Sequence, residues 1–283
     1  MFKDVAFGQY YPSNSPVHRL DARVKLLLTI LFVVGIFFVN SYFGFMLTAV
    51  VLIAIVLLAK LPVISVLKSV RGILFIVLFT AIINLFFIKD GEVLVQAGTL
   101  IITKNGVHTT IKMVLRLVLL ISGASLLSLT TTPVELADGM ESLMSPLKLI
   151  RVPVRDIAMI MSIALRFIPT LFEETNKIIA AQKARGASLD TGGLFARIKA
   201  LLPVLIPLFV GSFRRADELA FAMDARCYNA TDKRTKMKKA KIGIGDIIAV
   251  LFMGGFFTVI ILERYYFPTV GINIDLAIFG DLL

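Results

Sequence analysis

Long apolar runs, separated by short polar breaks, dominate the chain. With their flanking residues, about five of these runs approach the length of roughly 20 residues that a helix needs to cross the hydrocarbon core of a bilayer. They are Leu26 to Val39, Tyr42 to Ala59, Gly72 to Ile88, Ile111 to Leu129 and Ile244 to Leu262. The pattern therefore predicts an all-α membrane protein with about five transmembrane helices.

Turn residues interrupt this pattern between the third and fourth runs. Asp90-Gly91 and Asn105-Gly106 flank two short apolar stretches, Val93 to Val95 and Leu100 to Thr103. Such spacing is typical of a β-hairpin. We expect a small excursion of the chain on the extracytoplasmic side.

A second pattern begins at Pro133, where charged residues of both signs become frequent. Apolar residues three and four apart from Val134 to Ile150 predict an amphipathic helix. Two long helices follow, from Pro153 to Ala184 and from about Leu194 to Arg226, each with an apolar front half and a polar back half. Basic residues flank both apolar halves, which disfavours the alternative that these halves cross the membrane.

These patterns divide the chain into three parts. Residues 1–132 hold a polar lead and four spans, residues 133–241 form a cytoplasmic helical domain, and residues 242–283 hold the last span and a tail. The basic run from Lys233 to Lys241 marks a cytoplasmic edge before the last span. The N-terminus is then expected inside the cell and the C-terminus outside.

The composition supports the membrane class. Hydrophobic residues make up 58% of the 283 residues, against roughly 45–50% in soluble domains. The formal net charge of +11 would suggest nucleic acid in a soluble protein. In a membrane protein the same excess is typical of cytoplasmic loops, and no basic groove with interleaved aromatic residues is seen. We therefore expect a lipid bilayer, and no nucleic acid, as a partner.

One short pattern occurs twice, each time at the far end of a long predicted helix. The two copies read Ala181-Gln182-Lys183-Ala184-Arg185-Gly186 and Ala222-Met223-Asp224-Ala225-Arg226-Cys227. A single arginine in a last helical turn is usually solvated and favoured by the helix dipole. Two copies with the same spacing favour a docking role, because small residues permit close approach and a guanidinium forks onto carboxylate or backbone oxygens.

Chemical motifs point away from catalysis in this chain. The sequence has no phosphate-binding Gly-x-x-x-x-Gly-Lys-Ser/Thr loop, and His18 and His108 lie far apart without other metal-ligand residues nearby. The first three spans carry essentially no ionisable residue at their centres, which disfavours a proton-coupled carrier. We expect no catalytic, cofactor or metal site.

Three stretches together resemble a known family. Ser15 to Leu26 is similar to the family pattern His-Arg-Leu-Asp-Pro-Arg-x-Lys-Leu, with Ala22 in place of proline. Leu165-Arg166-Phe167-Ile168-Pro169 and the acidic pair Glu173-Glu174 also match, as does the ending Ala184-Arg185-Gly186. The ending Ala225-Arg226-Cys227 has cysteine where the family has glycine, which bears on the helix cap but not on the arginine. The chain resembles the transmembrane T component of energy-coupling factor (ECF) vitamin and metal transporters over almost its full length.

This resemblance implies a fold and a set of partners. The helices of residues 133–241 would be three coupling helices, the two long ones crossed. They would dock into grooves on two ATP-binding-cassette (ABC) ATPase subunits, which bind ATP and Mg, while a separate membrane-embedded S component binds the substrate. The implied ATPase-binding residues are Ala184, Arg185, Gly186, Ala225, Arg226 and Cys227. Arg166, Pro169, Glu173 and Glu174 would support the coupling helices. The chain itself would be a non-catalytic subunit in the prokaryotic plasma membrane.

Two rival functions remain open from the residues alone. A self-sufficient channel or secondary carrier would move ions or solutes without partners. A membrane-embedded enzyme would need converging acids, for which Glu173, Glu174, Asp217 and Glu218 are the candidate cluster. Their basic neighbours on regular helices favour a solvated or subunit-facing surface instead.

Overall fold

A computed structural model describes residues 10–90, 93–97, 100–146, 153–187, 193–228 and 243–266. Its contacts form two compact units. We call Gly8–Val154 with Lys241–Leu283 the membrane unit, and Arg155–Ala240 with Met1–Phe7 the long-helix unit. The division of the chain into residues 1–132, 133–241 and 242–283 says which parts lie in the membrane and which lie in the cytoplasm. It stays a prediction.

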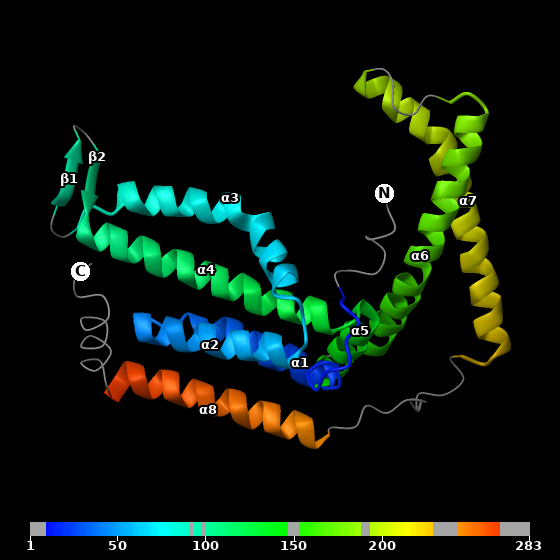
Figure 1. Ribbon diagram of the computed structural model, residues 1–283. Coiled ribbons are helices and arrows are strands. Elements are labelled where there is room, and N and C mark those ends of the chain that lie inside the picture. The colour runs from blue at the N-terminus through cyan, green and yellow to red at the C-terminus, as the bar shows by residue number, and fades with distance from the viewer. Residues whose placement is uncertain are drawn as a thin grey trace. The chain divides into compact units, whose positions relative to one another are not determined.

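The membrane unit contains six of the described helices and a two-stranded sheet (Figure 1). The helices are α1 (Ala22–Ile36), α2 (Tyr42–Leu58), α3 (Val63–Phe87), α4 (Lys104–Thr130), α5 (Pro133–Leu143) and α8 (Ile244–Tyr266). The side chains of Asp21, Ser41 and Thr103 accept backbone hydrogen bonds and so begin α1, α2 and α4. Each cap satisfies an N–H group that a helix leaves without an internal partner.

Three described helices are long and apolar enough to cross a membrane. They are α3, α4 and the Ile244–Glu263 part of α8. α2 is apolar but has 17 residues, and α1 has 15, about 26 and 23 Å at 1.5 Å per residue. The first apolar run is therefore helical over a shorter stretch than expected, because the chain leaves the helix after Ile36 to reach the Ser41 cap. The count of about five spans stays a prediction.

The interior of the membrane unit is apolar and closely packed. Phe32 of α1, Phe45 of α2, Leu119 of α4 and Ile260 of α8 belong to one buried cluster. A Cβ atom added at Gly123 of α4 would overlap the ring of Phe32. The glycine therefore lets α1 and α4 approach closely.

The predicted hairpin is confirmed. Strands β1 (Val93–Ala97) and β2 (Leu100–Thr103) pair antiparallel, with Ala97 opposite Leu100. Thr103 also donates its hydroxyl to the carbonyl of Ile88 at 3.1 Å, which joins the end of α3 to the start of α4.

The amphipathic helix predicted from Val134 to Ile150 is shorter in the structure. α5 ends at Leu143, and residues 147–150 lie outside the described part of the chain. Pro146 explains the early end, since it has no N–H to give to the carbonyl four residues earlier and disfavours helical backbone at Ser145. The start is well defined by a capping box between Thr132 and Glu135.

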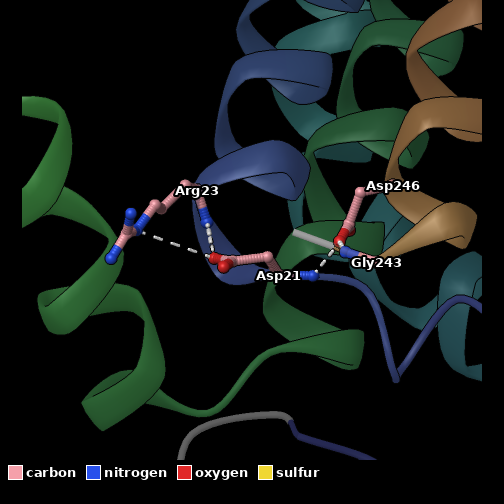
Figure 2. Close-up of polar contacts among 4 residues, drawn as sticks. All are labelled: Asp21, Arg23, Gly243 and Asp246. Carbon is pink, nitrogen blue, oxygen red and sulfur yellow. Dashed lines mark hydrogen bonds and ion pairs between the residues drawn. The ribbon is translucent and has the colours of Figure 1, made fainter. Parts of the chain in front are cut away.

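A polar junction ties the starts of α1 and α8 together (Figure 2). The backbone N–H of Asp21 donates to Oδ1 of Asp246 at 2.9 Å, and the N–H of Gly243 donates to Oδ2 at 2.7 Å. The carboxylate of Asp21 accepts from the N–H of Arg23 at 3.0 Å. Asp246 is 4% exposed, so it is a buried acceptor shared by two helix starts.

Lys25 extends this junction to the end of α4. Its ammonium donates to the carbonyls of His18 and Thr130 at 3.0 and 2.9 Å. Burial lowers the pKa of Lys25, and the carboxylate of Glu135 acts in the opposite direction. The family-like stretch Ser15 to Leu26 thus serves to join α1, α4 and α8 at one end of the membrane unit.

The long-helix unit holds α6 (Val154–Ala184) and α7 (Leu194–Ala225), with 31 and 32 residues. The two long helices expected from the sequence are confirmed to within a residue at each end. α6 contains Pro169, and α7 contains Pro203 and Pro207. Figure 1 shows α7 crossing α6.

Candidate functional site

The two arginine-bearing helix ends have the same backbone geometry. At the end of α6, the N–H of Gly186 donates to the carbonyl of Lys183 and that of Ala187 donates to Gln182, both at 3.0 Å. This pair of reversed hydrogen bonds is the Schellman motif, with Arg185 as the last residue before the left-handed position.

At the end of α7 the same bonds recur in the same register. The N–H of Cys227 donates to the carbonyl of Asp224 at 2.9 Å, and that of Tyr228 donates to Met223 at 3.1 Å. Arg226 holds the place that Arg185 holds in α6. The repeated sequence pattern is therefore a repeated three-dimensional ending.

The cysteine does not change the cap. Gly186 has a φ of 87° and Cys227 a φ of 54°, so both occupy the left-handed region that closes a Schellman motif. A side chain there costs about 1–2 kcal/mol relative to glycine. Cysteine in place of glycine at position 227 thus makes the cap less stable, but the hydrogen bonds and backbone conformation of the cap are the same.

The arginines and the small residues beside them form exposed tips. Ala184, Arg185, Gly186, Ala225, Arg226 and Cys227 are all exposed. An arginine here interacts favourably with the negative end of the helix dipole. Each tip can insert into a concave surface and offer its guanidinium to carboxylate or carbonyl oxygens there.

The four expected support residues lie along α6, away from its tip. Arg166 and Glu173 are exposed and Pro169 is half-buried within the helix. Glu174 is different: its carboxylate forms an ion pair with Arg215 of α7, at 2.5 Å between Oε2 and Nη2. The structure thus places Glu174 at a contact between the two long helices.

Two residues at this contact were missed by the sequence analysis. They are Arg215 and Gly211, where an added Cβ would lie 3.2 Å from Oε1 of Glu174. A signal was present: aligning Arg185 with Arg226 sets Glu173-Glu174 against Arg214-Arg215. Opposite charges at matching places in a repeat indicate that the two copies pair with each other.

The acidic cluster proposed for an enzyme does not converge. Glu174 is paired with Arg215, and Glu173, Asp217 and Glu218 are exposed. In the described part of the chain, no three His, Cys, Asp or Glu side chains form a group that could hold a metal ion. The expectation of no metal or cofactor stays a prediction.

Known proteins are similar to this chain over most of its length. Residues 13–237 match a family model described as a cobalt transport protein. The energy-coupling factor transporter transmembrane protein EcfT of Ruminiclostridium cellulolyticum is 49% identical over 267 residues, which cover 94% of this chain and all of the relative. The chain belongs to the EcfT family.

Other members support the assignment. The EcfT proteins of Thermosediminibacter oceani and Bacillus subtilis are each 44% identical, over 252 and 239 residues. The matches cover 89% and 84% of this chain, and 95% and 90% of those relatives. The resemblance found in the sequence is thereby confirmed. The chain is a multi-pass membrane component of an ECF transporter, in a family that is not itself catalytic.

Proposed function

We propose that this EcfT-family chain couples two ABC-type ATPase subunits to a membrane-embedded S component that binds a micronutrient, either a vitamin or a metal. The observation that carries the proposal is the pair of identical Schellman ends, each exposing one arginine. Two like tips on one chain suit two like grooves on a pair of homologous subunits. ATP and Mg would bind to those partners, and this chain would need no cofactor.

Transmission would follow the long helices. ATP binding would close the ATPase pair and displace the arginine tips, and α6 and α7 would carry that displacement toward the S component. In this arrangement the N-terminus and the coupling helices α5, α6 and α7 face the cytoplasm of a prokaryotic cell. The S component would select the cargo.

Co-purification tests the docking role. Tagged wild-type chain, co-expressed with ATPase subunits from the same cell, should recover two ATPase subunits. Arg185→Glu/Arg226→Glu should lose both, because each tip would then present a carboxylate to a groove built for a cation. A matched control, Lys177→Glu/Lys199→Glu, reverses one exposed charge on each helix and should assemble normally.

The outcomes separate the rival functions. An Arg185→Glu/Arg226→Glu chain that assembles and transports like wild type would contradict the docking role. A wild-type chain that purifies alone and conducts solute in liposomes would identify a channel or carrier instead.

A further inference from the structure

The two long helices touch through polar contacts at two places. One is the Glu174–Arg215 ion pair, beside Gly211. The other is a hydrogen bond at 3.4 Å from Nε2 of Gln182 to the carbonyl of Pro203. Because residue numbers rise on α6 as they fall on α7, the helices run in opposite directions across these contacts.

The ion pair is at the same distance from both tips. Glu174 precedes Arg185 by eleven residues, and Arg215 precedes Arg226 by eleven. Each arm is therefore about 16 Å long at 1.5 Å per residue. Since the helices are antiparallel, the two arms extend to opposite sides of the pair.

This contact has the character of a pivot. The Glu174 and Arg215 side chains are 27% and 33% exposed, so the pair is largely shielded from water. Gly211, one turn before Arg215, leaves the space that the Glu174 carboxylate occupies. Val204, which is 3% exposed, adjoins Pro203 at the second contact.

The second contact fills a gap in the backbone bonding of α7. In an α-helix the carbonyl of Pro203 would accept from residue 207, but Pro207 has no N–H. The amide of Gln182 supplies a donor instead. Gln182 lies in the last turn of α6, where its own carbonyl accepts from Ala187 in the Schellman motif of the Arg185 tip.

We propose that Glu174 and Arg215 form the pivot between α6 and α7, and that Gln182 latches the Arg185 tip onto the proline segment of α7. A single contact would let the helices rotate about it, whereas two contacts about 12 Å apart along α6 fix their angle. A change of about 10° at the pivot would move the end of an arm by about 3 Å relative to the other helix. These residues would set the positions of the arginine tips. The effect of this positioning on transport rests on the proposed docking role.

Spin labels across the latch test this directly. In a Cys227→Gly background, cysteines at Ala180→Cys on α6 and Lys199→Cys on α7 would be labelled in the full-length chain. Pulsed electron paramagnetic resonance should give a narrow distance distribution. Glu174→Arg or Arg215→Glu should broaden it and shift it by several ångströms, and Gln182→Glu, which keeps the shape but removes the donor, should broaden it less.

Charge exchange supplies the rescue. The double variant Glu174→Arg/Arg215→Glu should restore the narrow distribution, because the opposite charges again face each other. The neighbouring exchange Glu173→Arg/Arg214→Glu alters the same charges one residue earlier, at exposed positions, and should leave the distribution unchanged. Single reversals that keep the wild-type distribution, or a double variant that fails to restore it, would overturn the pivot.

Assembly and MgATP hydrolysis by the purified complex give the second readout. The single reversals should recover less ATPase subunit and hydrolyse MgATP more slowly, and the double variant should regain both. Distances are measured on the chain alone, so they test the pivot even without ATPases. Wild-type chain that recovers no ATPase would contradict the docking role only, while unchanged distances with normal assembly would contradict the pivot only.

Discussion

The two units of the molecule are held together by different forces. In the membrane unit, apolar side chains from α1, α2, α4 and α8 fill one continuous interior. In α6 and α7, apart from Val154, which belongs to the membrane unit, Val204 is the one buried side chain among those the structure describes, and polar contacts join α6 to α7. Close packing permits one arrangement, because any shift leaves voids or clashes. Two polar contacts hold the angle between α6 and α7 without a continuous packed interior, so a change of that angle breaks few interactions.

The largest expected effect comes from overfilling the membrane unit. Gly123→Leu would place side-chain atoms where Phe32 now lies, and overpacking typically costs about 1–3 kcal/mol or more of the free energy of unfolding. Thermal unfolding in detergent measures the loss. Gly254→Leu is the matched control, since a Cβ there meets no atom within 4 Å. Equal destabilisation by both substitutions would show that the Gly123–Phe32 contact is not critical.

A smaller effect is expected at the polar junction of the same unit. Asp246→Ala leaves the N–H groups of Asp21 and Gly243 without their acceptor. Both bonds are part-buried, so water can reach these groups and the total cost should lie toward the lower end of about 1–3 kcal/mol. Asp246→Asn keeps one carbonyl oxygen and nearly the same volume, and should lose less. Unfolding in detergent again reports the difference. An alanine variant as stable as the asparagine variant would contradict the shared-acceptor role.

The smallest effect distinguishes the two tips of the long-helix unit. Cys227→Gly should stabilise the end of α7 by about 1 kcal/mol, because glycine reaches a φ of 54° without strain. Gly186→Ala should weaken the end of α6 by a similar amount. Hydrogen exchange of the two Schellman amides of α7, at position 227 and at Tyr228, should slow by about fivefold in the first variant. Unchanged exchange would show that the cysteine is accommodated without strain.

Local signals in the sequence predicted the limits of an element well where proline or glycine lies next to its ends. Pro153 and Gly186 bound α6, and the two apolar stretches expected in the hairpin were close to its strands. Asn105-Gly106, expected as a turn, instead lies in the first turn of α4, which begins at Lys104. α5 ended early because Pro146 outweighed the apolar periodicity that continues past it. The tips were predicted as a pair, because both copies of the pattern are visible in the chain.

Contacts between distant residues were harder to predict. The Gln182–Pro203 hydrogen bond uses a carbonyl that has no donor within α7, because Pro207 lacks an N–H group. That Gln182 of α6 supplies the donor can be seen only when both helices are in place. The Glu174–Arg215 pair could have been found by aligning the two copies beyond their last six residues. The burial of Asp246 under two helix starts could not be predicted, since its partner Asp21 lies more than two hundred residues earlier in the chain. Its other bond, from Gly243, is local to the start of α8.

Cys227 also gives the molecule a natural chemical reporter. It is the chain's single thiol, it is exposed, and it follows Arg226 directly. A maleimide dye would therefore attach at one tip alone, and its rate of attachment would measure how often that tip is uncovered. If ATPase subunits dock on this tip, labelling of Cys227 should slow in their presence. The labelling rate during rounds of MgATP addition would then report docking and release of the tip.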